Sequence, residues 1–181
     1  MEITKATTTT TTNSSSLQHR IATMRQSFFD EGLLDSFFVQ MEDLKGFAPP
    51  DFVEEMVTTF ITHSEPKIAD IEEAMDAVIQ NGEESVDMNS VDVKIIKLRS
   101  GGATIGAAKI RAKAGDVWNS WKDRDWLRAK AAVEEVKTEI HDLRTKLEPY
   151  FQLLREAEAA KQVEASLRAQ PPSPRTSSAN N

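Results

Sequence analysis

The sequence predicts an all-α protein, an antiparallel helical bundle with additional N-terminal helices. Apolar residues recur at intervals of three and four along most of the chain, which is the period of an amphipathic helix. No stretch alternates apolar and polar residues in the manner of a strand. Glycine and proline are scarce, at seven each in 181 residues, so long helices can run between short loops.

Length and composition bound the domain organisation. A chain of 181 residues with 39% hydrophobic residues supports one domain with a packed core. We expect a helical domain over 16–165 between two disordered tails. Residues 1–15 are a Thr/Ser tract with almost no apolar content, and residues 166–181 end in a segment rich in Pro and Ser. Ser173 precedes a proline there and is a candidate phosphorylation site, although an unused Ser-Pro pair is the more common case.

Composition also excludes several classes of function. The chain has no cysteine, which rules out disulfides and cysteine-based metal or nucleophilic sites. The net charge of −7 argues against nucleic-acid binding, which depends on clustered Lys and Arg. No apolar run is long enough to cross a membrane, and the N-terminus lacks the apolar segment of a secretory signal. We expect no metal, no cofactor and no small-molecule substrate.

Two short helices open the predicted domain. The first spans 16–30 and ends near Gly32; its apolar stripe consists of Leu17, Ile21, Met24 and Phe28. Asp35 can cap the second, over 36–45. The apolar residues of this second helix are Phe37, Phe38, Met41 and Leu44. The segment GFAPPD that follows is predicted to be a loop.

A long helical segment comes next. Asp51 is its predicted cap, and the segment ends near Gln80. Pro66 lies inside it and either kinks the helix or marks a restart after Ser64 and Glu65.

Three helices complete the prediction. They span 88–104, 107–122 and a final stretch that begins at Asp123 or Asp125 and ends near 165. Pro149 lies inside the last helix and is expected to bend it or to mark its weakened end.

Helical spacing divides the helix over 88–104 into two faces. A buried stripe at intervals of four and three consists of Val91, Ile95, Leu98, Gly102 and Ile105. Ile96 is rotated by about 100° from Ile95. Most neighbours on its own face are polar or small, so we expect Ile96 at the surface or at its edge.

The second half of this helix is unusually poor in side chains. Gly101 and Gly102 each cost about 1 kcal/mol in a helix interior relative to alanine, so we expect some compensation. A neighbouring helix could pack closely at Gly102, or a partner's backbone could approach where the small residues face outward. The alternative is a helix that frays or breaks at this pair.

This region resembles the signature of plant histidine-containing phosphotransfer (HPt) proteins, His-Gln-Leu/Phe-Lys-Gly-Ser-Ser-Ser-Ser-Ile/Val-Gly-Ala. The matching positions are Leu98, Ile105, Gly106 and Ala107. Arg99 replaces the lysine, Ser100 replaces the glycine, and residues 101–104 replace the serines. Further segments resemble the family in the same order, so the resemblance covers about 17–160. These segments are 31–44, 50–65, 86–92 and 137–153.

The resemblance implies an HPt-type antiparallel four-helix bundle and a task in a phosphorelay. Family members accept a phosphoryl group from a receiver-domain aspartate on a histidine and pass it to another receiver. Ile96 occupies the position of that histidine. An alkyl side chain cannot form a phosphoramidate, so the resemblance is to a pseudo-HPt protein, which is not an enzyme. The three histidines of the chain, His19, His63 and His141, lie outside the signature and are more simply explained as surface or structural residues.

The altered signature retains features of a docking surface for receiver domains. The residues that the resemblance implies for partner binding are Ile96, Lys97, Arg99, Ser100, Gly101, Ala103, Leu34 and Phe37. Arg99 and Lys97 carry a charge that suits an acidic receiver site, although a solvated basic helix face explains them equally well. Ser100 is larger than the family's glycine and could crowd the approach. Core packing is the alternative for Leu33, Leu34, Phe37 and Phe38, and the simpler one for any two of them.

Two functional hypotheses follow. In the first, the chain binds receiver domains of sensor histidine kinases and response regulators and damps a phosphorelay by competition; the family implies cytokinin signalling, in cytoplasm and nucleus. In the second, it is a scaffold bundle that no longer binds receivers, and its segment from Arg155 onward pairs with another helix. A third hypothesis, an active enzyme, has little support, because the sequence contains no nucleophile–base cluster, no phosphate-binding loop and no metal-ligand spacing.

Overall fold

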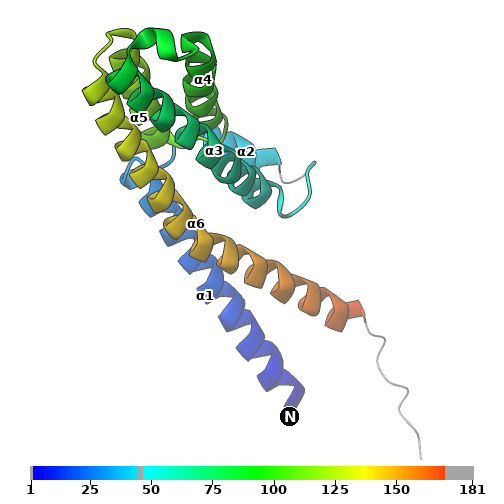
Figure 1. Ribbon diagram of the computed structural model, residues 1–181. Helices are drawn as coiled ribbons and strands as arrows, with labels where there is room; N and C mark the ends of the chain where they lie inside the picture. The colour runs from blue at the N-terminus through cyan, green and yellow to red at the C-terminus, as the bar shows by residue number, and fades with distance from the viewer. Residues whose placement is uncertain (1, 45–46, 170–181) are drawn as a thin grey trace, which may run out of the picture.

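A computed structural model describes residues 2–44 and 47–169, with side-chain environments from residue 15 onward. Over the described residues the chain forms six α-helices and no strand, which confirms the all-α prediction (Figure 1). The helices are α1 (Glu2–Asp30), α2 (Ser36–Asp43), α3 (Phe52–Asn81), α4 (Met88–Thr104), α5 (Ala108–Lys122) and α6 (Trp126–Ala169), and a 3-10 turn, η2 (Glu83–Ser85), lies between α3 and α4. None of these described helices is long and apolar enough to cross a membrane.

Four of the helices form an antiparallel bundle. α5 packs between α4 and α6, and α3 closes the ring by contacting α4 and α6. Short connections make neighbours in sequence neighbours in space. α1 lies along α6 and α2 contacts α4, so the two N-terminal helices are additions to the bundle, as predicted (Figure 1).

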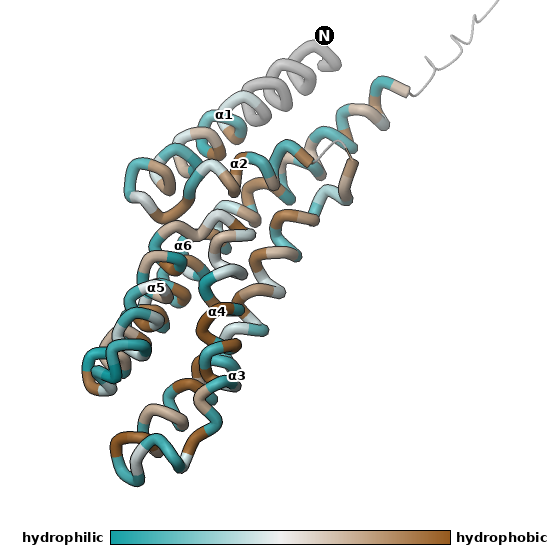
Figure 2. Tube along the Cα trace, turned by 90° about the horizontal axis from the view of Figure 1, so that it is seen from above, coloured by the Kyte–Doolittle hydropathy of each residue, from teal (hydrophilic) through white to brown (hydrophobic). Residues whose placement is uncertain are grey.

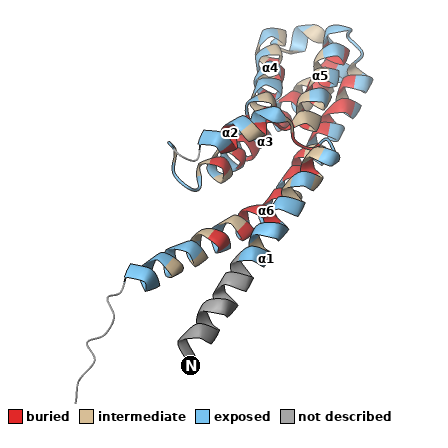
Figure 3. Cartoon of the chain, turned by 180° about the vertical axis from the view of Figure 1, so that it is seen from behind, coloured by how far each residue is buried: buried red, intermediate tan, exposed pale blue. Residues whose placement is uncertain are grey.

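The bundle is held by apolar stripes that face inward. Figure 2 shows the hydrophobic segments interleaved with hydrophilic ones along each helix, and Figure 3 shows buried residues lining the inner faces. In α4 the buried residues are Val91, Ile95, Leu98 and Gly102, the stripe predicted from helical spacing. Ile96 is 49% exposed, as expected for a residue turned away from that stripe.

Helix starts follow the capping predictions with one exception. The Asp35 carboxylate accepts a hydrogen bond of 2.9 Å from the Phe37 N–H and caps α2. Asp125, rather than Asp123, opens α6, and its carboxylate accepts the Arg128 N–H at 3.1 Å. Asp51 is the N-cap residue of α3, as predicted, but its side chain makes no capping hydrogen bond.

Both internal prolines lie within continuous helices. α3 runs through Pro66, which excludes a restart at that point. α6 runs through Pro149, and Figure 1 shows this helix changing direction in its golden section. A proline in a helix interior removes one backbone hydrogen bond and favours such a bend.

The outer ends of the first and last helices differ from the expected boundaries. α1 begins at Glu2, so its helical backbone includes the Thr/Ser tract for which we expect disorder. The side chains of residues 1–14 lie outside the description, and the disordered N-terminal tail stays a prediction. α6 ends at Ala169, slightly beyond the expected 165. Residues 170–181, with Ser173, lie outside the described residues.

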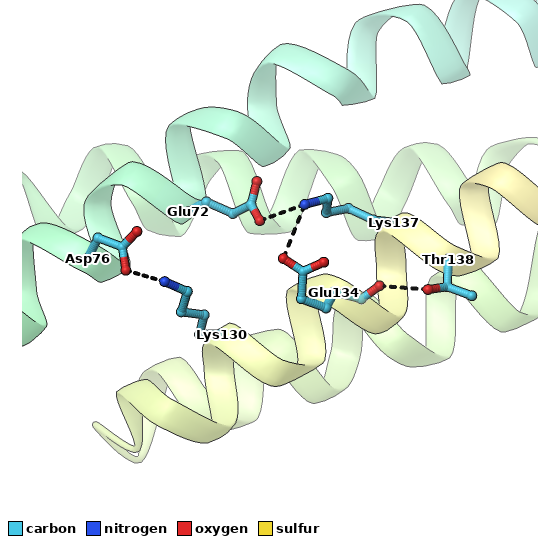
Figure 4. A network of polar contacts seen from close by, with 6 residues as sticks. All are labelled: Glu72, Asp76, Lys130, Glu134, Lys137 and Thr138. Carbon is cyan, nitrogen blue, oxygen red and sulfur yellow. Dashed lines mark hydrogen bonds and ion pairs between the residues drawn. The ribbon is translucent and has the colours of Figure 1, made fainter.

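Ion pairs on the outer surface align α6 with α3 (Figure 4). Lys137 Nζ lies 2.9 Å from Glu72 and 3.1 Å from Glu134, while Lys130 pairs with Asp76. The hydrogen bond that Lys137 donates to the Glu72 carboxylate is the main reason that the pKa of Lys137 is raised. Exposed pairs contribute little stability, typically about 0.2–1 kcal/mol each. Their effect is to favour one register of α6 along α3.

A buried polar junction ties α1 and α2 to α6. The Glu42 carboxylate of α2 accepts hydrogen bonds of 2.7 Å from Arg25 Nε of α1 and of 2.7 Å from the Tyr150 hydroxyl of α6. The Tyr150 ring is buried and meets Phe28 edge-on at 5.5 Å between centroids. Burial raises the pKa of Tyr150 well above its usual value, and the Glu42 carboxylate raises it further.

The loop between α1 and α2 pairs with the turn between α4 and α5. Leu34 and Ala107 form an isolated antiparallel bridge. The two backbone hydrogen bonds run from Asp35 N–H to Gly106 O at 2.9 Å and from Ala108 N–H to Leu33 O at 3.1 Å. Gly106 has a φ of 69°, and a Cβ atom at this position would lie 2.3 Å from the Phe38 nitrogen. Only glycine fits at this contact.

Replacing Gly106 should therefore destabilise the fold strongly. We expect Gly106→Ala to lose about 3 kcal/mol or more, because an unfavourable φ and a backbone collision act together. Gly32→Ala is the matched control: Gly32 has a φ of 64° but nothing within 4 Å of the added Cβ, so a loss of about 1 kcal/mol is expected. Denaturant unfolding of both variants measures the difference. Equal losses would contradict the close approach at Gly106.

Tyr150 should titrate far above its usual range. It is the single tyrosine of the chain, so tyrosinate absorbance reports on it alone. Its folded pKa lies above the unfolded value of 10.0, so its contribution to stability is complete below pH 10 and is lost as the pH rises further. Tyr150→Phe should cost about 1–3 kcal/mol at neutral pH, because Glu42 loses a buried donor, and should flatten the alkaline loss of stability. Titration of the folded protein near pH 10 would refute the buried bond.

Candidate functional site

The outward face of α4 presents four of the residues expected to contact a partner. Ile96, Arg99, Ser100 and Ala103 follow one another at helical spacing of three and four, so they share one face. The first three are exposed and Ala103 is partly buried. α4 continues as a helix to Thr104, so it neither frays nor breaks at the glycine pair.

Each glycine of the pair is required by a different packing contact inside the protein. A Cβ atom on Gly102 would lie 3.2 Å from Ile110 Cγ2 of α5, which confirms close helix packing at this position. A Cβ atom on Gly101 would lie 2.8 Å from the Phe60 ring of α3. Gly101 is turned by about 140° from Ile96 around the helix. The bare position at Gly101 is therefore explained by the Phe60 ring, and the expected contact of Gly101 with a partner stays a prediction.

The facing side of α5 completes a surface hollow. Arg111, Gly115 and Trp118 recur at four and three, so they lie on one face of α5. Arg111 and Trp118, together with residues of α4, line a hollow of about 410 Å³, called here the α4–α5 hollow. Its lining residues are Ile95, Ile96, Arg99, Ser100, Ala103, Arg111 and Trp118. A Cβ atom on Gly115 would lie 4.0 Å from Arg99 Nε, so the Arg99 side chain extends from α4 toward α5 at the position where α5 has no side chain.

The three residues on this face of α5 were not predicted from the sequence. The sequence does contain a signal for them: Gly115 is a glycine inside a predicted helix, with the large residues Arg111 four positions before it and Trp118 three positions after it. That signal shows which residues share a face, but not that the face lies opposite Arg99.

Of the two arginines that line the hollow, one has no ion-pair partner among the described residues. Arg111 pairs with Asp35 at 2.9 Å. Asp92, one turn before Ile96, accepts the Trp121 Nε1–H at 2.8 Å and pairs with Lys122. Among the described residues Arg99 makes no ion pair. The nearby carboxylates are thus neutralised, and Arg99 gives the hollow a net positive charge.

Ser100 lines the hollow, and Lys97 lies beside it. The Ser100 hydroxyl donates to the Lys97 carbonyl at 3.3 Å, so it turns back onto its own helix. The side chain therefore occupies less of the approach than its size alone suggested. Lys97 is exposed and, within the described part of the chain, has no ion pair; it does not line the hollow.

The two expected contact residues outside α4 differ in their exposure. Leu34 is only 3% exposed and belongs to the core, together with Leu33 and Phe38. The expected contact with a partner does not fit a buried side chain, and core packing explains Leu34. Phe37 is 47% exposed and adjoins Phe38, which packs on Gly106 just beyond the C-terminal end of α4. Phe37 can therefore extend the exposed surface of α4.

The arrangement can bind an anion but offers no group for phosphoryl transfer. No histidine lines the hollow; His19, His63 and His141 lie on α1, α3 and α6. Over the described residues no cluster of three or more His, Asp or Glu could hold a metal ion. The hollow combines alkyl groups, an indole and guanidinium donors.

Comparisons with known proteins agree with the sequence resemblance. No family model matches the chain. The chain is 32% identical over 142 residues to pseudo histidine-containing phosphotransfer protein 2 of Oryza sativa subsp. japonica, covering 78% of this chain and 90% of that protein. It is 29% identical over 137 residues to histidine-containing phosphotransfer protein 1 of Arabidopsis thaliana, covering 75% and 84%.

Solved structures show the same fold. The histidine-containing phosphotransfer protein of maize superimposes with a TM-score of 0.68 at 26% identity, covering 77% of this chain and 98% of that one. A homologous protein of Medicago truncatula gives a TM-score of 0.70 at 24% identity, covering 80% and 94%. The sequence similarity to the rice protein and the shared helical bundle with its additional N-terminal helices support the same conclusion. The chain belongs to the plant histidine-containing phosphotransfer family, as a pseudo-HPt member.

Proposed function

We propose that this protein binds receiver domains of two-component histidine kinases and response regulators and damps a phosphorelay without carrying phosphate itself. Family membership supports a role in two-component phosphorelays. The observation that carries the proposal is Ile96, a half-exposed alkyl group at the rim of the α4–α5 hollow. In the register of the family signature, this is the position of the phosphoacceptor histidine.

The proposed mechanism is competition for the receiver surface. A receiver that is occupied by this protein can neither give nor take a phosphoryl group from an active HPt protein. Arg99 and Lys97 provide positive charge for docking on an acidic receiver site, and Ile96 with Phe37 provides apolar contact area. Ser100, folded back onto the Lys97 carbonyl, leaves room for the approach.

Further parts of the proposal come from the family resemblance alone. The phosphorelay that we propose is cytokinin signalling, and the compartments are the cytoplasm and the nucleus. Expression of the chain in plant cells, with a cytokinin reporter and a fluorescent tag, would test both. The protein acts here as a binding protein and not as an enzyme.

A scaffold role is the second candidate. It is favoured by α6, which continues to Ala169 and carries the exposed residues Val163 and Leu167 at an interval of four. Such a pair can contact another helix. A binding titration separates the candidates, because a scaffold would bind no receiver.

The chain should accept no phosphate from a phosphorylated receiver domain. No imidazole is present at position 96, so no acid-labile, alkali-stable phosphohistidine should form. An active HPt protein serves as the positive control. Ile96→His should gain partial labelling, since the rest of the helix is intact. Phosphohistidine on the unaltered chain would refute the proposal.

Docking should depend on Ile96. Ile96→Glu should weaken receiver binding about tenfold or more, because it removes an apolar contact and places a negative charge against an acidic partner. The matched control is Leu127→Glu at the start of α6, where the leucine is 74% exposed and lies outside the hollow. Titration calorimetry gives both affinities, and thermal unfolding should show that both variants stay folded. Equal affinities for the two variants would count against docking on this face.

A further inference from the structure

We propose that the α4–α5 hollow recognises the aspartyl phosphate of a docked receiver, so that the protein binds phosphorylated receivers in preference to unphosphorylated ones. The inference rests on the proposed function and adds the state of the partner to it. It concerns non-covalent binding only: the acyl phosphate stays on the receiver and no bond is made or broken.

The first support is the free guanidinium of Arg99. It lines the hollow, makes no ion pair with any described residue and extends toward Gly115, where α5 carries no side chain. A planar guanidinium suits the oxygens of a phosphoryl group better than an ammonium does. An unphosphorylated receiver presents a carboxylate at the same place, with less charge and fewer acceptor oxygens. Arg99 should therefore discriminate between the two states.

The second support is Arg111, which reaches the hollow from α5. The ion pair with Asp35, at 2.9 Å, neutralises the charge of Arg111 but holds its side chain in place. Asp35 itself is held by its backbone bond to Gly106. The remaining guanidinium N–H groups of Arg111 are thus preorganised donors on the opposite wall from Arg99, at little cost in side-chain entropy on binding.

The third support is the absence of a competing charge in the hollow. Asp92 is engaged by Trp121 and Lys122, and Asp35 by Arg111. No carboxylate lines the hollow. A phosphoryl group would therefore meet neutralised carboxylates and one unpaired cation.

The walls of the hollow also fit an acyl phosphate that is bound and not consumed. Ile96 and Ala103 supply alkyl groups, Trp118 supplies an indole, and the Ser100 hydroxyl is bonded to the Lys97 carbonyl. None of the first three is a nucleophile. Apolar walls exclude water from a docked phosphoryl group, so hydrolysis of the receiver's aspartyl phosphate should slow in the complex.

The test compares one isolated receiver domain of a plant sensor histidine kinase in two states, untreated and loaded with beryllofluoride, an inert mimic of the aspartyl phosphate. Titration calorimetry with the full chain should give about fivefold to tenfold tighter binding to the loaded receiver, the size expected of one partly exposed charge-assisted contact. A second measurement follows the lifetime of the true aspartyl phosphate, which should lengthen when the chain is present in excess.

A pair of matched variants assigns the effect. Arg99→Gln should bring the affinity ratio of the two receiver states close to one. Arg128→Gln removes the same charge from the start of α6, an exposed arginine outside the hollow and without an ion pair among the described residues, and should keep the ratio.

Three other results would each overturn the inference. Equal affinity for the two receiver states would do so while leaving the proposed function standing. A ratio unchanged by Arg99→Gln would show that the preference arises elsewhere. Binding to neither state would instead remove the proposed function, and this inference with it.

Discussion

The contact on which the functional surface depends is the pairing of the α1–α2 loop with the α4–α5 turn. Gly106 permits it, because the Phe38 backbone lies where any side chain would stand. The two hydrogen bonds across the pair fix where α4 ends and α5 begins, and they bring Asp35 to Arg111. The hollow between α4 and α5 follows from this connection. The N-terminal helices thus contribute to the site without lining it.

The glycines around the site act in different ways. Gly102 lets α5 approach α4, Gly101 accommodates the Phe60 ring of α3, and Gly106 allows a left-handed turn against Phe38. Gly115 opens space in front of Arg99. Three of the four serve packing inside the bundle. The bare appearance of this region in the sequence is therefore mostly a requirement of the fold, and only the part around Ile96 and Ala103 faces outward, where we propose that a partner binds.

Much of the site was predictable because it lies on one helix. Helical spacing placed Ile96 outside the core stripe, and the same spacing brings Arg99, Ser100 and Ala103 to its face. Predictions were weaker wherever two elements had to be related. Leu34 was expected to meet a partner, yet it is buried and pairs with Ala107. The bare position at Gly101 is explained by the Phe60 ring, which the sequence did not place there. Asp51 occupies the predicted N-cap position of α3, but its side chain makes no capping hydrogen bond.

The sequence by itself determined the all-α class, the order of the helices, the buried stripe of α4 and the exposure of Ile96, since each depends on the period of a single helix and on its ends. Only the tertiary structure decided what stands opposite Arg99, which glycine serves which neighbour, and that Glu42 joins Arg25 to Tyr150 across three helices. The physical reason is separation along the chain. Periodicity assigns a residue to a face, whereas the partner of that face is chosen by packing among distant segments and by the few close backbone contacts that glycine allows.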